Sequence, residues 1–202
     1  MSQSLLDKES FNTLCTSVGL DYRLTKCLKK LGFQHPTLVQ TKSLPLAITA
    51  GRDLLVRART GSGKTLAYCL PILHKILKGE EKRSDTNDDG FVKAVILVPT
   101  KELCMQVTNT LNNLTFFCED EITVGTLMAG SNASAAALAQ QEAMLRDEPN
   151  IIISTPAGLL AHIRSEGSNL KSSMKHSVES LVVDEADLVL SFGVCSFDDL
   201  NL

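Results

Sequence analysis

The apolar positions of the first 50 residues recur at helical spacing. Leu24, Cys27, Leu28 and Leu31 lie three or four residues apart, and Gly32 follows them as a stop signal. A second helical stretch opens at residues 36–37 and runs to residue 50, before Gly51. The pattern therefore predicts an amino-terminal helical region over residues 1–50.

From residue 53 onward, short apolar runs alternate with helical patterns. The apolar runs predict strands at residues 53–56, 92–98, 122–128, 151–154 and 177–183. The helical patterns predict helices at residues 66–77, 102–117, 132–146 and 157–164. Strands that alternate with helices predict an α/β domain whose parallel sheet is covered by helices on both faces. In such sheets, ligands sit outside the carboxyl ends of the strands.

The composition limits the class of protein but does not indicate a particular reaction or ligand. The chain has 202 residues, a formal net charge of −3 and six cysteines, none of them in a Cys-x-x-Cys pair. The chain has no general excess of basic residues, so any nucleic acid must be held by a few specifically positioned hydrogen-bond donors. We expect an intracellular protein with reduced thiols and no membrane span, because no apolar run approaches ~18 residues. The polar segment at residues 79–90 predicts a solvated loop.

A glycine-rich segment lies between an apolar run and a helical pattern. Glycines let successive backbone N–H groups curl around phosphate oxygens, and the amino end of the next helix favours anions. A lysine there supplies a point charge, and Thr65 can place its hydroxyl on Mg²⁺. A flexible Gly/Ser turn is the alternative, but the strand–loop–helix context favours nucleotide binding. The candidate phosphate-binding residues are Ala58, Arg59, Thr60, Gly61, Ser62, Gly63, Lys64 and Thr65, with Ala58 at the position where the phosphate-loop pattern has its first glycine.

The last predicted strand runs directly into carboxylates. Asp184 follows the apolar run 177–183 and fits the role of a hard oxygen ligand for Mg²⁺. Glu185 could orient or deprotonate an attacking water. The alternative is a solvated acidic turn. With Lys64, these two carboxylates are the candidate catalytic residues, and Thr65 and Asp184 are the candidate metal ligands.

Residues 184–187 spell Asp-Glu-Ala-Asp, the signature of DEAD-box RNA helicases, and other segments agree with that family in order and spacing. Residues 32–40 resemble its Q motif, which implies that Gln40 reads the adenine edge, with Phe33 and Thr37 supporting the pocket. The family places an aromatic residue upstream, at the position that aligns with Cys15. Phe11 lies one helical turn earlier, and the identity of the adenine-stacking residue stays open.

Three further segments resemble the family's RNA-contacting motifs. Residues 99–103 are similar to Pro-Thr-Arg-Glu-Leu, with Lys101 in place of arginine, so bidentate phosphate contact is lost. Residues 129–130 resemble a Gly-Gly step. Residues 155–159 resemble Thr-Pro-Gly-Arg-Leu, but Gly158 stands where the arginine is expected, which removes a cation. The resemblance implies RNA contacts, to the sugar-phosphate backbone, at Pro99, Thr100, Lys101, Gly130, Thr155 and Pro156.

The resemblance implies a RecA-like P-loop NTPase fold over residues 51–193, incomplete at its carboxyl-terminal end, followed by a divergent tail over residues 194–202. The family carries a second helicase domain, which we do not expect within these 202 residues. These residues also lack the Ser-Ala-Thr motif, whose strand lies in the family between the phosphate-loop strand and the acidic strand. Both neighbours would then lack a backbone partner, at ~1–3 kcal/mol for each buried unpaired group.

Residues 57–65 and 190–193 most resemble the branch of the family that acts in large ribosomal subunit assembly, which implies a nuclear, nucleolar protein that meets pre-ribosomal particles. The favoured hypothesis is an ATP-dependent RNA helicase that uses ATP and Mg²⁺. A second hypothesis is a catalytically inactive truncated isoform or fragment that binds only nucleotide or partners, with negligible unwinding by residues 1–202 alone. A third, a P-loop ATPase without a nucleic-acid substrate, does not explain the ordered RNA-motif segments.

Overall fold

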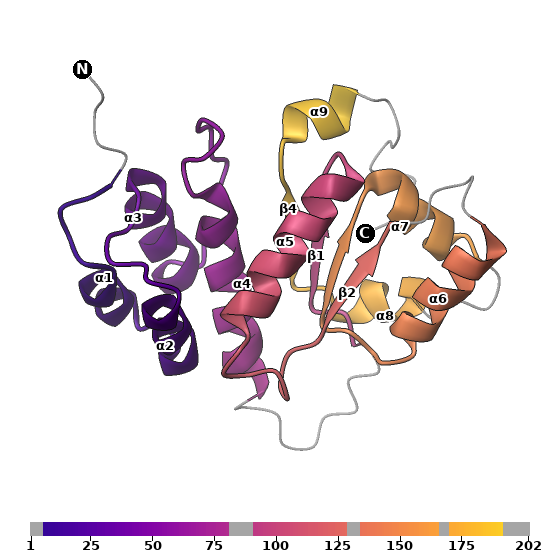
Figure 1. Cartoon of the computed structure of the whole chain (residues 1–202), viewed down its shortest axis with the longest axis horizontal. Helices are drawn as coiled ribbons and strands as arrows, with labels where there is room; N and C mark the ends of the chain where they lie inside the picture. The colour runs from indigo at the N-terminus through magenta and orange to yellow at the C-terminus, as the bar shows by residue number, and fades with distance from the viewer. Residues whose placement is uncertain (1–5, 81–90, 129–133, 166–169, 192–202) are drawn as a thin grey trace. The chain divides into compact units, whose positions relative to one another are not determined.

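The computed structural model describes residues 6–80, 91–128, 134–165 and 170–191. The chain divides into two compact units (Figure 1). Unit 1 comprises residues 1–83 and 110–121, and unit 2 comprises residues 84–109 and 122–202.

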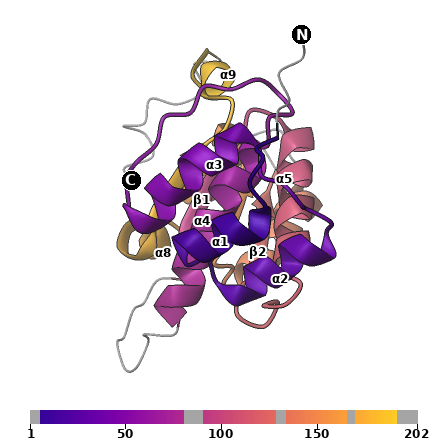
Figure 2. The same cartoon turned by 90° about the vertical axis from the view of Figure 1, so that its left-hand side faces the viewer.

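Unit 1 is helical in all its described regular elements, as predicted for residues 1–50. Figure 2 looks onto this unit, with α1, α2 and α3 toward the viewer. Its elements are α1 (Phe11–Val18), α2 (Tyr22–Lys30), α3 (Leu38–Leu44), the π-helical turn η1 (Pro45–Thr49) and α4 (Lys64–Glu80).

Local chemistry fixes the ends of these helices. The hydroxyl of Ser10 caps α1, and Gly19 ends it in the left-handed conformation, with φ of 65°. Asp21 caps α2 through a hydrogen bond from Arg23 N, while its own N–H donates to His74 Nδ1 on α4 at 3.1 Å. This bond joins α2 to α4 over apolar side chains that are fully buried. Those side chains are Leu24, Leu28, Leu44, Leu70, Leu73 and Leu77.

Unit 2 contains a four-stranded parallel sheet with strand order β2-β3-β1-β4. The strands are β1 (Ala94–Leu97), β2 (Val124–Leu127), β3 (Ile151–Ser154) and β4 (Ser180–Val183). The helices are α5 (Lys101–Leu114), whose residues 110–114 belong to unit 1, α6 (Ala135–Leu145), α7 (Pro156–Ile163), α8 (Leu170–Ser177) and α9 (Ala186–Ser191). The parallel α/β class predicted from the sequence is confirmed. The short helices α8 and α9 were not predicted.

Helices cover both faces of this sheet. One face packs against α7 and α8. On this face Val95, Leu97 and Ile152 of the strands form a buried cluster with Leu159 of α7 and Met174 of α8. The opposite face meets α5, whose Thr108 hydroxyl lies 2.8 Å from the hydroxyl of Thr126 on β2. Every residue of β1 and β3 is buried, as expected for strands inside a parallel sheet.

The strand predicted at residues 53–56 is wrong. The segment has no regular structure, and the side chain of Leu55 is 99% exposed. A strand needs a neighbour for its backbone N–H and C=O groups, and within the described residues none pairs with this segment. The same holds for the outer edge of β4, which pairs only with β1 and leaves Leu181 44% exposed. These are the two segments that the sequence predicts to lack a neighbour.

Among the described residues, no helix combines the length and apolar character that crossing a membrane would require.

Candidate nucleotide and nucleic-acid sites

Gln40 connects the start of α3 to the glycine-rich loop within unit 1. Its side-chain Nε2 donates to the carbonyl of Gly63 at 3.1 Å, and its Oε1 accepts from Thr37 N at 2.8 Å. The hydroxyl of Thr37 accepts in turn from Gln40 N, which completes a capping box. Gln40 is only 2% exposed. The two segments that the sequence singles out for adenine and phosphate are therefore bonded to each other.

The glycine-rich loop has the backbone shape that its composition predicts. Gly61 and Gly63 take φ values of 77° and 86°, in the region that favours glycine. The next residue, Lys64, begins α4, so the free N–H groups of the first helical turn follow the loop directly. Ser62 is buried, and its hydroxyl has no hydrogen-bond partner within the described part of the chain. An oxyanion of a bound phosphate would give that hydroxyl and those N–H groups their acceptor.

The ammonium of Lys64 hydrogen-bonds to the backbone of its own loop. It donates to the carbonyl of Ala58 at 2.9 Å and to that of Arg59 at 3.2 Å. These neutral acceptors are weaker partners for an ammonium than a phosphate oxygen is. The loop therefore holds the lysine in place and can release it to an anion at modest cost.

The two glycines of the loop offer a matched test of this coupling. A methyl group at position 63 would lie 2.5 Å from Gln40 Nε2 and 3.0 Å from Thr37 Oγ1, whereas one at position 61 meets nothing within 4 Å. Both positions have positive φ, so both substitutions to alanine carry backbone strain of ~1–3 kcal/mol. We expect Gly63→Ala to lower the free energy of unfolding by about 1–3 kcal/mol more than Gly61→Ala in urea titrations. Equal losses would show that the contact between Gln40 and the loop does not matter.

An aromatic pair lies beside the Q-motif segment. The rings of Phe11 and Phe33 are 6.3 Å apart and tilted by 58°. Phe11 is 2% exposed and Cys15 is equally buried, while Phe33 is 39% exposed. The structure thus places Phe33 at the surface of this pair. Which ring stacks on a base stays a prediction.

In unit 2, three predicted segments meet at one edge of the sheet. The strand register pairs Leu97 at the end of β1 with Ser154 on one side and Val183 on the other. The N–H of Asp184 donates to the carbonyl of Leu97 at 2.9 Å, and the N–H of Val98 donates to that of Ser154 at 3.0 Å. The segments that follow these strands therefore lie at adjacent carboxyl ends. They hold Pro99, Thr100 and Lys101, then Thr155 and Pro156, then Asp184 and Glu185.

The acidic segment is a tight turn between β4 and α9. The carboxylate of Asp184 accepts from Glu185 N at 2.9 Å, and Glu185 takes φ of 49°. A glutamate in the left-handed region carries backbone strain, which the surrounding structure must offset. The turn begins beside the end of β1, because Asp184 N donates to the carbonyl of Leu97.

Two threonines cap the helices that follow β1 and β3 in the same way. The hydroxyl of Thr100 accepts from Leu103 N at the start of α5, and that of Thr155 accepts from Gly158 N at the start of α7, each at 3.2 Å. Lys101 is exposed beside the first of these caps. Both helix starts therefore face the edge of the sheet that carries the acidic turn. Gly130 and its neighbour Ala129 lie outside the described residues.

Gly158 is tightly packed. A methyl group at this position would lie 2.7 Å from the carbonyl oxygen of Leu127 and 2.9 Å from the hydroxyl of Ser154. The preceding Ala157 is exposed. At Gly158 the sequence predicts only the loss of a cation, and the packing role of this glycine appears only in the structure. The glycine lets α7 approach β2 and β3, and the buried Ser154 hydroxyl, which donates to Leu127 O at 2.7 Å, fixes the same contact.

The described residues contain no group of three or more His, Cys, Asp or Glu side chains that could hold a metal ion by themselves. Mg²⁺ does not need one, because it commonly takes one or two protein ligands together with substrate phosphates and water. The two predicted ligands, Thr65 and Asp184, belong to different units. Their joint role stays a prediction.

The sequence profile of the DEAD/DEAH box helicase family matches residues 37–198. The chain belongs to this family. It is 45% identical to the probable ATP-dependent RNA helicase ddx56 of Dictyostelium discoideum, over all of this chain and 27% of that protein. It is 42% identical to the ATP-dependent RNA helicase DBP9 of Saccharomyces cerevisiae, over 94% of this chain and 30% of that protein. The chain thus spans less than a third of the length of these curated relatives.

Solved helicase structures share the fold. DEAD-box helicase Mss116 bound to single-stranded RNA and UDP-BeF superposes with a TM-score of 0.74 at 26% identity, covering 96% of this chain and 36% of that one. The RNA helicase Prp28 from Chaetomium thermophilum, bound to ADP, gives a TM-score of 0.70 at 30% identity, covering 91% of this chain and 40% of that one. A DEAD box protein from Methanococcus jannaschii gives 0.71 at 27% identity, covering 95% and 45%. The RecA-like fold predicted from the sequence is thereby confirmed.

Proposed function

We propose that these residues form the ATP-binding part of an ATP-dependent RNA helicase, which couples ATP hydrolysis to the unwinding or remodelling of RNA. The observation that carries the proposal is the bond from Gln40 to the carbonyl of Gly63. It joins the residue expected to read adenine to the loop expected to hold phosphates. The names of the curated relatives, both ATP-dependent RNA helicases, support it. In this proposal residues 1–50 are a helical region with the Q motif, and residues 51–193 are the ATP-binding domain.

The nucleotide is held by the loop and its helix. Lys64 exchanges its carbonyl partners for the outer phosphates, Ser62 and the first N–H groups of α4 donate to phosphate oxygens, and Thr65 contributes a hydroxyl to Mg²⁺. When bound, Mg²⁺ neutralises the negative charge that develops during phosphoryl transfer. Gln40 and Phe33 form the base side of the pocket, in which Gln40 keeps one N–H beyond the bond to Gly63.

The acidic turn performs the chemistry. Asp184 is the carboxylate ligand of Mg²⁺, and Glu185 orients the attacking water and accepts its proton. RNA lies along the sheet edge that carries Pro99, Thr100, Lys101, Thr155 and Pro156. Gly130, which lies outside the described residues, is a further RNA contact in this proposal. These contacts go to the sugar-phosphate backbone, so they carry no base specificity.

We infer a place in large ribosomal subunit assembly for this helicase, with residence in the nucleus and nucleolus and with pre-ribosomal particles as partners. The support is the likeness to the DBP9 and ddx56 proteins, together with the sequence of residues 57–65 and 190–193, which resembles that branch.

The test of the function is ATP hydrolysis with and without RNA, measured as phosphate release by the full-length natural product that carries these residues. Single-stranded RNA is expected to raise the rate severalfold, and a DNA strand of the same length and sequence serves as the control. A rate that RNA leaves unchanged would favour a P-loop ATPase without a nucleic-acid substrate.

A further inference from the structure

Helix α2 concentrates positive charge on an otherwise acidic chain. Its nine residues, YRLTKCLKK, include Arg23, Lys26, Lys29 and Lys30 and no carboxylate. The chain as a whole carries a net charge of −3. The apolar side chains of α2 are buried in unit 1, and the three lysines are exposed. The helix therefore presents its charge to solvent along one face.

Arg23 does not contribute to this surplus, because two carboxylates neutralise it. Its guanidinium makes a 2.9 Å ion pair with Asp21 and another with Glu121. Burial opposes ionisation of Asp21, but hydrogen bonds from Arg23 outweigh it, so the pKa of Asp21 lies below its ordinary value. Lys26, Lys29 and Lys30 have no carboxylate partner among the described residues, so their charge is available to a ligand.

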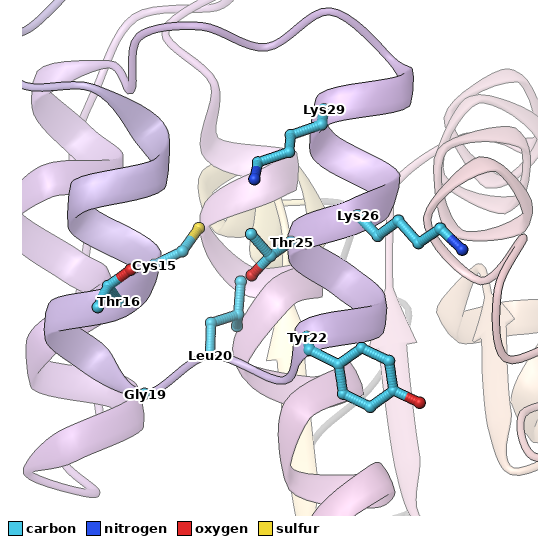
Figure 3. Close-up of a pocket in the computed structure, with 8 residues that line it drawn as sticks. All are labelled: Cys15, Thr16, Gly19, Leu20, Tyr22, Thr25, Lys26 and Lys29. Atoms are coloured by element: carbon cyan, nitrogen blue, oxygen red, sulfur yellow. The ribbon is translucent and has the colours of Figure 1, made fainter.

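A groove runs beside this face, between α1 and α2. It consists of two adjoining hollows of about 410 and 310 Å³, both lined by Cys15, Thr25 and Lys29. Figure 3 shows Lys29 extending from α2 into the space between the helices, where Cys15 and Thr25 also point. No acidic side chain lines either hollow. The groove is therefore a cationic, hydroxyl-bearing channel.

Aromatic rings are interleaved with the lysines. Tyr22, in the first turn of α2, is 74% exposed, and Phe116 is 49% exposed. Lys30 Nζ stands over the ring of Phe116, and Lys26 Nζ lies 4.1 Å from the ring centre of Phe117. The solvated charged face of an amphipathic helix needs no exposed aromatic residues. Exposed rings among lysines that have no carboxylate partner in the described residues are instead typical of surfaces that bind single-stranded nucleic acid.

We propose that Tyr22, Lys26, Lys29 and Lys30, with the groove between α1 and α2, form a binding surface for single-stranded RNA. We call these residues the α2 surface. The lysines neutralise phosphates, and Tyr22 stacks on a base. The hydroxyls of Thr16 and Thr25 donate to the carbonyls of Asn12 and Asp21, so they accept hydrogen bonds from ribose hydroxyls. None of these residues belongs to the RNA motifs at the sheet edge of unit 2. The proposal rests on the function proposed above in one respect only, which is the choice of RNA as the polyanion that binds here.

The experiment measures the affinity of the 202-residue chain for a fluorescein-labelled 12-nucleotide oligouridine at several salt concentrations, without nucleotide. The variant Lys26→Gln/Lys29→Gln is expected to bind about tenfold more weakly at low salt. Loss of two phosphate contacts should lower the slope of log affinity against log salt by about 1.4. Tyr22→Ala should weaken binding roughly fivefold or more, and Tyr22→Phe should restore it, because stacking needs only the ring.

The matched control is Lys171→Gln/Lys175→Gln, two exposed lysines on α8 of unit 2. It removes the same charge and should change neither the affinity nor the slope by a significant amount. Thermal melting of each variant shows whether it is folded. The variant Lys26→Arg/Lys29→Arg keeps the positive charge and should therefore bind RNA like the unmodified chain.

Three results would overturn the proposal. The first is unchanged affinity in the α2 double variant, or absence of RNA binding by the unmodified chain. The second is an equal loss of affinity in the α8 control, which would mean that RNA binding depends only on the total positive charge of the chain. The third is displacement of the oligouridine by a poly-glutamate peptide at equal charge concentration, which would identify an acidic-peptide site. Because no ATP is present, these outcomes are separate from failure of the nucleotide site.

Discussion

Replacing Glu185 with glutamine is expected to slow RNA-stimulated ATP hydrolysis about 10²–10⁴-fold, the range typical of a lost general base. Glutamine has nearly the same shape, so the turn that Glu185 N makes with the Asp184 carboxylate should persist. What disappears is the proton acceptor for the attacking water. ATP affinity should stay within about threefold of the unmodified value, because phosphate binding rests on the loop around Lys64. Phosphate release at saturating ATP measures the first quantity, and equilibrium titration measures the second.

Glu148 provides the matched control for this substitution. It is the other described non-glycine residue with positive φ, at 51°, and it is exposed in the turn between α6 and β3. Glu148→Gln makes the same chemical change at the same backbone conformation, outside every motif. Its rate should equal that of the unmodified protein within about twofold. A Glu185→Gln variant that hydrolyses ATP as fast as the Glu148→Gln variant would remove Glu185 from the mechanism.

Lys64→Ala is expected to weaken ATP binding about 10–150-fold, because a hydrogen bond to a charged group is worth roughly 1.5–3 kcal/mol. Among the described residues the ammonium bonds only to the carbonyls of Ala58 and Arg59, and the side chain is half-buried. The free energy of unfolding should therefore fall by less than about 1.5 kcal/mol. A fluorescent ATP analogue titrated into the variant, beside a urea melt, separates these two effects.

Lys75→Ala controls for the loss of one positive charge. Lys75 lies on the same helix, α4, and is exposed far from its amino end. Its removal should leave ATP affinity unchanged within about twofold. If both variants lose affinity equally, Lys64 attracts the nucleotide only through bulk charge.

Much of the fold could be predicted because its signals are local. The run 151–154 became β3 at its predicted bounds, and the stop glycines Gly32 and Gly51 lie in the left-handed conformation beyond their helices. The failure at residues 53–56 has the opposite cause. An apolar run shows that a segment can form a buried strand, but pairing depends on a neighbour elsewhere in the chain. The local sequence carries no information about that neighbour.

The same limit applies to the candidate sites. The pattern of residues 58–65 predicts a phosphate loop, and the glycines do take the expected conformation. Nothing in the pattern predicts that Gln40 bonds to Gly63, or that Lys64 rests on the carbonyls of its own loop. Gly158 is the reverse case, since its departure from the family pattern suggested only a lost charge. Its tight contact with Leu127 O depends on how α7 packs against the sheet.

The central claim is that Thr37, Gln40 and the loop ending in Lys64 form one nucleotide site. Titration of ATP and Mg²⁺ into the unmodified 202-residue chain, followed by calorimetry, tests it most directly. Saturable binding of one ATP per chain, weakened by Lys64→Ala and by Gly63→Ala but not by Lys75→Ala, is the predicted result. The absence of saturable heat, or binding that survives both loop substitutions, would contradict the claim.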